Sequence, residues 1–191
     1  MNLAQPSEVP RPVRLSVDDF LLLAESGAFD HLPKKVELLD GVITVMSPQL
    51  SRHMFVKSEF AFRLMSRLRE VGSPLKAFVD GTLTAPPANA PEPDIFLTNN
   101  PHGEGYAHVR EAPLVIEVAH TTVRHDLGPK KCIYAEAGVP EYWVLDIPGG
   151  KVHQFWSPRG ENYEGQRVVA LGELVASVTI PDLAVRSDGL I

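Results

Sequence analysis

The sequence predicts one α/β domain with a mixed sheet, and three observations lead to this fold class. Helix-like and strand-like patterns follow one another in the order helix, hairpin, helix, strands, helix, strands. The pair Asp40-Gly41 lies between two apolar runs, which is the strongest short-range signal for a β-hairpin. Residues 113–119, Pro-Leu-Val-Ile-Glu-Val-Ala, form a nearly continuous apolar run that is typical of a central strand.

The N-terminal part predicts an arm, a short helix and a hairpin. Residues 1–13 hold three prolines and little apolar content, so we expect a flexible arm before a domain that spans 14–191. Ser16 is a suitable N-cap for a short helix within residues 15–24, and Gly27 is its stop. The hairpin follows over residues 36–46, around the Asp-Gly turn.

The middle of the chain predicts the longest helix and then two strands. Apolar side chains recur with helical spacing over residues 50–71, and Gly72 ends the pattern. Residues 75–80 and 93–98 have strand character on either side of a connection rich in proline and alanine. Residues 99–110 predict a polar loop ahead of the central strand.

The last part predicts a second helix over residues 126–137, stopped by Gly138, and a strand over 141–146. A turn at 148–150 leads into a strand at 152–156, and the remaining residues are strand-like with turns. No internal repeat or linker interrupts this order, so one domain is expected.

Composition limits the class of protein. The chain has 191 residues, of which 44% are apolar and 22% charged, as in an ordinary folded protein. Its net charge of −6, from 18 basic and 24 acidic residues, argues against coating of nucleic acid by bulk charge. The single Cys132 excludes an internal disulfide and fits a reducing compartment. Without a long apolar segment or a secretory signal, we expect a cytoplasmic protein with no membrane partner.

Sequence motifs of several enzyme classes are absent. The chain has no Gly-x-Ser-x-Gly elbow, no Walker A loop, no dinucleotide-binding Gly-x-Gly-x-x-Gly, no His-Glu-x-x-His and no Cys-x-x-Cys. Any chemistry therefore has to come from a different set of residues.

The acidic residue Glu117 interrupts a strand that is otherwise apolar. A buried, unpaired carboxylate costs several kcal/mol, so a cation, a basic partner or a position in a cleft must compensate it. The alternative is a strand end that turns to solvent, or an ion pair with Arg110 or Lys131.

Two further groups of residues carry chemistry. Asp94 follows Pro93 at the entry of a predicted strand, where the alternative is an ordinary turn-forming role. Asp126, Lys130 and Tyr134 are spaced i, i+4, i+8 and share one helix face, where the alternative is a surface ion pair beside a half-buried tyrosine.

Taken together, two carboxylates on neighbouring strands and a lysine one helix away suit a metal site. Mg²⁺ is bound through a few carboxylate oxygens and several waters. A lysine beside the metal can orient or deprotonate a bound water, or stabilise charge on a phosphate. The combination predicts metal-assisted hydrolysis of a phosphodiester.

The sequence also resembles the Uma-two endonuclease family, within the PD-(D/E)XK restriction-endonuclease-like superfamily. The resemblance covers about residues 15–156. The motifs that carry it are Glu37-Leu38-Leu39-Asp40-Gly41, Met46-Ser47-Pro48, His53, Pro93-Asp94, Ile116-Glu117-Val118, Asp126-x-x-x-Lys130-x-x-x-Tyr134 and Gly138-Val139-Pro140-Glu141-Tyr142-Trp143.

The resemblance implies a restriction-endonuclease-like fold, with a mixed core sheet of four strands flanked by helices, preceded by the N-terminal helix and hairpin. It implies that Asp94 and Glu117 bind Mg²⁺, or Mn²⁺, and that Glu37 completes the site, although Glu37 could also be a solvent-facing strand acid. The lysine of the family motif normally stands two residues after the acid, where this chain has Ala119, and the resemblance points instead to Lys130 on the following helix.

Three residues are candidates for binding the substrate. Tyr134 is expected to support Lys130. His120 stands where the resemblance leads us to expect Ser or Asp, and it could cap a backbone group, contact phosphate or bind metal, or be a solvated loop residue. His53 could face the site or be a partly buried histidine with satisfied hydrogen bonds.

The leading prediction is a Mg²⁺-dependent nuclease whose partner is nucleic acid, most of all a DNA endonuclease. Two alternatives stay open: a catalytically inactive binding or scaffold protein of the same fold, and a metal-dependent hydrolase of a non-nucleic phosphoester. Basic residues cluster on the two helices, at Arg63, Arg67, Arg69, Arg124, Lys130 and Lys131, which favours a nucleic-acid partner. A homodimer is expected by fold analogy, formed by pairing of the apolar segments 152–156 and 174–185.

Overall fold

A six-stranded sheet is the centre of the computed structural model, which describes residues 12–32, 35–46 and 48–191. The predicted arm therefore falls largely outside the described residues, as does Ser47. The strand order is β10-β9-β8-β7-β5-β3. The strands are β3 (Lys76–Val79), β5 (Ile95–Thr98), β7 (Leu114–Ala119), β8 (Glu141–Asp146), β9 (Lys151–Arg159) and β10 (Asn162–Ala170).

The sheet is mixed, as predicted, because β7 and β8 run parallel while the other neighbouring pairs are antiparallel. It is wider than the four-stranded core that the resemblance implies. The additional width comes from β9 and β10, which form a nine-residue antiparallel ribbon joined by the Gly160 turn. The expected class, an α/β fold with helices on both sides of a mixed sheet, is confirmed.

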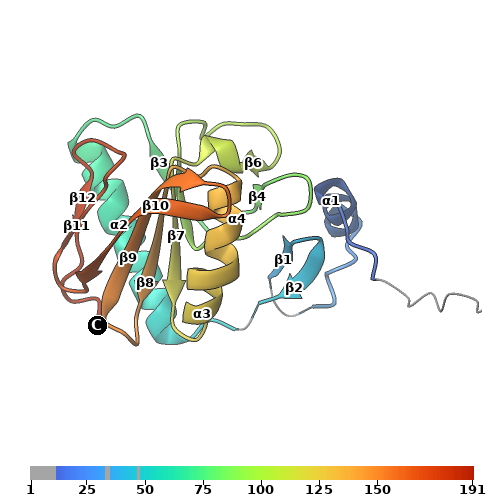
Figure 1. Ribbon diagram of the computed structural model, residues 1–191, viewed down its shortest axis with the longest axis horizontal. Helices are drawn as coiled ribbons and strands as arrows, with labels where there is room; N and C mark the ends of the chain where they lie inside the picture. Colours follow the sequence, from blue (N-terminus) through green and yellow to red (C-terminus); the bar gives the residue numbers. More distant parts are fainter. Residues whose placement is uncertain (1–11, 33–34, 47) are drawn as a thin grey trace, which may run out of the picture.

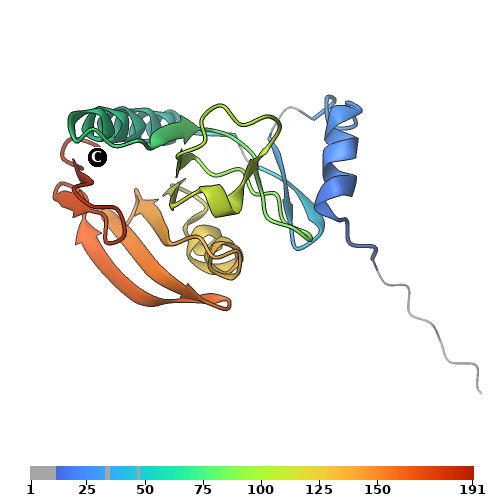
Figure 2. The same cartoon turned by 90° about the horizontal axis from the view of Figure 1, so that it is seen from above.

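Helices cover both faces of the sheet (Figure 2). The long helix α2 (Ser51–Glu70) packs on one face, against side chains such as Ile116 and Trp143. The small hairpin of β11 (Leu174–Ala176) and β12 (Ala184–Arg186) lies on that same face. Helix α4 (Lys131–Glu136) packs on the other face, against Val115 and Tyr142. This alternation follows from the period of two in a strand and places Glu117 on the α4 face, with Val115.

The second helix differs from its prediction, because residues 126–137 are not one continuous helix. The structure begins it earlier, at α3 (Val123–His125), and inserts an irregular segment, Asp126–Lys130, before α4. Gly128 has non-helical backbone angles and Pro129 has no N–H to donate, so the helical hydrogen-bond pattern stops there. The side-chain period continues across this interruption, which is why the sequence predicts one helix.

The N-terminal helix and hairpin form as predicted and lie at one end of the molecule (Figure 1). Helix α1 (Val17–Glu25) begins with a capping box between Ser16 and Asp19. Strands β1 (Val36–Leu39) and β2 (Val42–Val45) are joined by Asp40 and Gly41, both with positive φ, as a tight two-residue hairpin turn requires. One face of this hairpin packs on α1 around Phe20, in a small separate cluster.

Two short strands lie where the sequence predicts irregular chain. β4 (Leu83–Thr84) pairs in parallel with β6 (Ala107–His108), which lies inside the predicted loop 99–110. Two residues are too few for a strand pattern to be visible in a sequence.

The C-terminal segments are engaged within the chain. Strand β9, which contains the segment 152–156, is hydrogen-bonded on both sides, to β8 and β10. β11 and β12 pair with each other, and Val175 and Val185 are buried in the core. Segment 152–156 therefore has no free strand edge for the pairing across a dimer that the sequence predicts, whereas the pairing of β11 with β12 occupies one edge of each strand. The described residues also contain no helix long and apolar enough to span a bilayer.

Two basic residues of α2 bind other parts of the chain, whereas the sequence pattern predicts that they form a basic cluster for nucleic acid. Arg63 donates to the backbone carbonyls of Arg186 and Asp188, and Arg67 donates to the carbonyl of Asp182. Both arginines also pair with glutamates on the same helix. They attach the C-terminal hairpin to α2, so they are not a free basic surface.

Candidate active site

A cavity of about 210 Å³ lies between the β1–β2 hairpin, the start of α2 and the segment that follows β7. It combines acidic, histidine and threonine side chains with an apolar wall from β2 and the start of α2. The lining residues are Glu37, Thr44, Val45, Met46, Pro48, Gln49, Leu50, His53, Asp94, Glu117, Val118, His120, Thr121, Thr122, His125, Asp126 and Lys130. Seven of the eight residues that the sequence singled out line this cavity, and the eighth, Tyr134, contacts Glu117 in its wall.

The two candidate metal ligands are neighbours on adjacent strands. Ile95 pairs with Ile116 in the antiparallel β5–β7 register, so Asp94, one residue earlier, lies beside Glu117, one residue later. Both side chains therefore project from the same face of the sheet. The backbone N–H of Val118 donates to Oδ2 of Asp94 at 2.9 Å, which fixes that carboxylate at the strand end.

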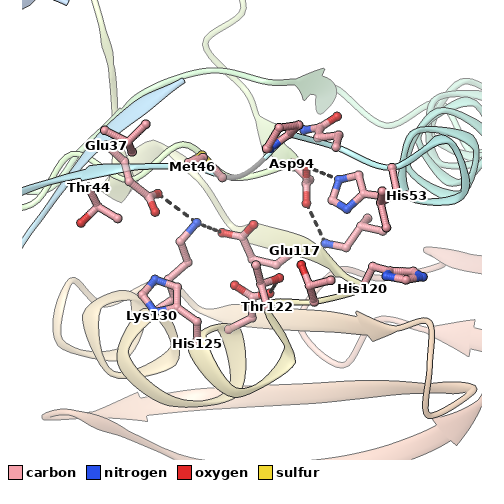
Figure 3. A pocket seen from close by; sticks show the side chains of 17 residues that line it. Glu37, Thr44, Met46, His53, Asp94, Glu117, His120, Thr122, His125 and Lys130 are labelled. Atoms are coloured by element: carbon pink, nitrogen blue, oxygen red, sulfur yellow. Dashed lines mark hydrogen bonds and ion pairs between the residues drawn. The ribbon is translucent and has the colours of Figure 1, made fainter. Parts of the chain in front are cut away.

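Lys130 lies between two glutamates. Its Nζ atom is 3.0 Å from Oε2 of Glu37 and 3.1 Å from Oε1 of Glu117, and Figure 3 shows the two carboxylates on either side of the ammonium. Tyr134 donates its hydroxyl to the same Oε1 atom at 2.9 Å. The three charged side chains are at most 3% exposed, so strand β1, strand β7 and the broken helix meet in one buried ion cluster.

The interrupted helix explains how Lys130 reaches Glu117 in a chain that has no lysine on the strand itself. Ala119, at the usual position of that lysine, is buried against the α4 side of the sheet together with Glu117. Lys130 enters the same space from the end of the irregular segment that contains Gly128 and Pro129. The ammonium group is thus supplied by a helix, while its position beside the acid is retained.

Burial and charge decide the protonation of this cluster. Burial raises the pKa of Glu117 to about 8, although the Lys130 ammonium opposes this, and Asp126, Asp94 and Glu37 raise it further. Burial alone would lower the pKa of Lys130, but the nearby carboxylates of Glu117, Glu37 and Asp126 outweigh it and raise that pKa. Lys130 therefore stays an ammonium at neutral pH, and excess negative charge is relieved by a proton on Glu117.

Asp126 is a further buried acid in the cavity wall. Its Oδ2 atom accepts a hydrogen bond from the hydroxyl of Thr122 at 2.5 Å, and burial raises its pKa. His120 and His125 complete this side of the cavity. Among the described residues, the Nδ1 atom of His120 is buried without a hydrogen-bond partner, although the ring itself is partly exposed.

His53 faces the site, the first of the two possibilities that the sequence left open. Its Nε2 atom is 3.0 Å from Oδ1 of Asp94 (Figure 3). One turn further along α2, Nζ of Lys57 is 3.5 Å from the same oxygen and 2.8 Å from Oδ1 of Asp80. Sequence reasoning missed Lys57 and Asp80. The available signal was a lysine on the buried face of α2, four residues after His53 and beside the apolar Val56.

The residues present fit a hard divalent cation. Asp94 and Glu117 face one cavity, and four acids line it against one buried lysine, so a divalent cation can take the place of the proton that relieves the excess negative charge. The described residues hold no group of three or more His, Cys, Asp or Glu side chains placed as a metal cage. Mg²⁺ does not need such a cage, because it is usually held by one or two carboxylates together with waters and substrate phosphate.

Comparisons with known proteins agree with the fold and with the family resemblance. The model of the Uma2 family, described as "Putative restriction endonuclease", matches residues 17–187, which confirms the family resemblance. The chain is also similar to a crystal structure described as a "putative nuclease belonging to DUF820 from Anabaena variabilis ATCC 29413". The two are 17% identical with a TM-score of 0.66, over 94% of this chain and 97% of that chain, so this likeness concerns the fold. No curated protein matches the chain.

Proposed function

The chain belongs to the Uma2 family, and on this basis we propose that it is a metal-dependent nuclease that hydrolyses phosphodiester bonds, acting as a DNA endonuclease. The observation that carries the proposal is the meeting of Asp94, Glu117 and Lys130 in one buried cavity. Two acids and an ammonium on separate elements cost several kcal/mol to desolvate, and a purely structural role gives no reason to arrange them around a cavity.

In this proposal Asp94 and Glu117 bind Mg²⁺, or Mn²⁺ in its place. A bound divalent cation would polarise the phosphoryl oxygens and stabilise charge that develops at phosphorus. Glu37 acts through Lys130, whose ammonium it holds at 3.0 Å on the side opposite Glu117. Val118 holds Asp94 in place through its backbone N–H.

Lys130 serves as an ammonium donor, because the surrounding carboxylates raise its pKa and keep its proton in place. It can orient an attacking water or stabilise charge on the phosphate, but it is unsuited to accept a proton. Tyr134 shares Oε1 of Glu117 with Lys130 and so fixes the carboxylate that both contact.

In this proposal, His53 and His120 bind the substrate. His53 lies on the α2 side of the cavity and His120 on the opposite side, after β7. The Nδ1 atom of His120 makes no hydrogen bond to any described residue, and the ring is partly exposed, so a rotation of the imidazole would present this atom to a phosphate oxygen or to water. A DNA strand crossing the cavity between them would contact both imidazoles.

Two sites let an endonuclease cut both strands in one encounter, and this chain has one cavity of this composition among its described residues. We therefore include in the proposal a homodimer in the cytoplasm, formed through a surface other than the edges of β9. Sedimentation of the purified protein with and without DNA tests this part separately.

The decisive experiment incubates purified protein with supercoiled plasmid, single-stranded DNA and RNA, in Mg²⁺, in Mn²⁺ or in EDTA. The wild-type chain is compared with Glu117→Gln, which removes the candidate carboxylate ligand, and with Lys130→Met, which removes the ammonium. Glu161→Gln and Lys151→Met are matched controls, because both side chains are exposed. We expect metal-dependent cleavage that is lost in the two site variants and retained in the two controls.

Other outcomes separate the alternatives. Metal binding without cleavage of any nucleic acid favours a binding protein of the same fold. Cleavage confined to small phosphodiesters favours a hydrolase of non-nucleic substrates. Cleavage that persists in Glu117→Gln, or in EDTA, contradicts the proposed mechanism.

A further inference from the structure

A second buried lysine, Lys57, approaches Asp94, whereas Lys130 contacts Glu117, and Lys57 has no part in the mechanism above. Its Nζ atom donates to both carboxylate oxygens of Asp80, at 2.8 and 2.9 Å, and to Oε1 of Gln49 at 2.9 Å. The side chain of Lys57 is only 6% exposed. Its distance to Oδ1 of Asp94 is longer, at 3.5 Å.

Asp80 is attached directly to the residue that Lys57 approaches. It follows β3 with a positive φ of 54°, and its backbone N–H donates to the carbonyl of Asp94 at 3.1 Å. Its carboxylate also pairs with Lys35 at 2.7 Å. Burial raises the pKa of Asp80, but the two ammonium groups outweigh that effect and lower it, so Asp80 is an anion at neutral pH.

We propose that Asp80 sets the cation affinity of the site by holding the ammonium of Lys57 away from Asp94. The inference rests on the proposed function, because it treats Asp94 as a metal ligand. Lys57 has two competing carboxylates within reach, and it makes short contacts to both oxygens of one and a long contact to the other. Asp94 thus keeps an oxygen whose charge is available to a divalent cation.

The physical reason is competition between cations for one oxygen. If Asp80 loses its charge, the nearest anion for the buried Lys57 ammonium is Asp94, and a close ion pair there opposes binding of a second, divalent cation. Lys57 is then a positioning residue. It has little effect on cation affinity while Asp80 is charged, and it lowers that affinity when the charge of Asp80 is removed. This predicts a specific non-additivity between the two residues.

The test measures the affinity of Mg²⁺ and Mn²⁺ for the full chain by titration calorimetry, without nucleic acid. Asp80→Asn is expected to weaken binding by about tenfold or more, equivalent to about 1.4 kcal/mol. Lys57→Met alone leaves Asp80 paired with Lys35 and is expected to leave the affinity within about twofold of wild type. The double variant is expected to recover affinity relative to Asp80→Asn.

Two comparisons separate this inference from a loss of stability. Asp80→Glu retains the charge and is expected to bind the cation with nearly the wild-type affinity, whereas Asp30→Asn, at an exposed site, is a control for the substitution itself. The melting temperature of each variant is recorded in parallel. Recovery of affinity in the double variant counts for the inference only where the melting temperatures show that Asp80→Asn is itself fully folded at the temperature of the titration, because removal of an unpaired buried lysine also restores stability.

The inference is overturned if Asp80→Asn binds the cation as tightly as wild type, or if the double variant stays as weak as Asp80→Asn. Both results leave the proposed nuclease function intact, because the wild-type chain still binds metal. If the wild-type chain binds neither Mg²⁺ nor Mn²⁺, the metal role of Asp94 fails, and this inference fails with it.

Discussion

The hydroxyl of Tyr134 donates to Oε1 of Glu117 at 2.9 Å, and both side chains are shielded from bulk water. Because Glu117 lies on a strand and Tyr134 on a helix, this bond connects the sheet to α4 at the candidate active site. It also fixes the carboxylate by a neutral donor, independently of the ammonium of Lys130.

Removing that donor gives a first prediction. Tyr134→Phe is expected to destabilise the protein by about 1–3 kcal/mol, the usual cost of losing a hydrogen bond to a buried charged or polar group. Tyr163→Phe is the matched control, because the Tyr163 hydroxyl is buried without a partner among the described residues, and its loss should be close to neutral. Denaturation by urea measures both, and equal losses in the two variants would contradict the assignment.

The raised pKa of Glu117 predicts an unusual pH dependence of stability. Its pKa rises from an ordinary value of 4.5 to about 8, so the folded state binds more protons than the unfolded state between these values. The free energy of unfolding in EDTA should therefore fall as pH rises through this window, with a slope of at most about 1.4 kcal/mol per pH unit. The contribution of Glu117 to the free energy of unfolding is complete below pH 4.5 and is lost above about pH 8.

Glu117→Gln isolates this contribution, because it removes the titration and leaves the other acids in place. The difference in free energy of unfolding between the wild type and the variant should change steadily from pH 5 to pH 8, by at most about 1.4 kcal/mol per pH unit. Saturating Mg²⁺ should reduce the dependence in the wild type, since binding favours the ionised carboxylate. If the free energies of unfolding of the two proteins depend on pH in the same way, the raised pKa of Glu117 is refuted.

Loss of Lys130 should be severe. Lys130→Met leaves Glu37 and Glu117 buried without their shared ammonium, and removing one partner of a buried ion pair costs about 3–5 kcal/mol. The double variant Glu37→Gln/Lys130→Met should recover part of that loss. Lys151→Met, at an exposed position, should change the free energy of unfolding by less than about 0.5 kcal/mol. A small effect at Lys130 measured by denaturation would mean that the cluster is hydrated in solution.

Glu141 supports a prediction outside the site. This completely buried carboxylate accepts from the indole of Trp143, the hydroxyl of Ser177, the backbone N–H groups of Val178 and Thr179, and the Thr179 hydroxyl. Glu141→Gln places an amide donor against these donors and should cost about 2 kcal/mol or more. Faster hydrogen exchange at the Val178 and Thr179 amides would locate the damage, whereas Glu161→Gln should leave exchange unchanged.

Much of the fold could be predicted because the local signals agree with the tertiary structure. The Asp40-Gly41 turn forms with the two positive φ angles that its sequence indicates, and Ser16 caps α1 as expected. The central strand β7 is buried on both faces along its length, which is why its sequence is almost continuously apolar. Glu117, the exception within that run, does lie in the candidate site.

Other features depend on contacts between distant parts of the chain and leave weaker sequence signals. The irregular segment at Gly128 keeps the side-chain period of a helix, so it is invisible to a periodicity argument. Asp80 stands at the end of a short strand, where acids are common, and only the folded chain brings it against Lys57. The segment 152–156 has the apolar pattern of an interface strand, yet both of its neighbours come from the same chain.

Lys130 and Glu117 come from separate elements, and the twelve residues 118–129 between them include the break at Gly128 and Pro129. One residue inserted or deleted before Lys130 would turn its side chain by about 100° around the helix axis. A relative of this protein could therefore preserve every site residue in an alignment and still point its lysine away from the acid. Spacing between β7 and α4 is thus as informative about activity as the identity of the residues themselves.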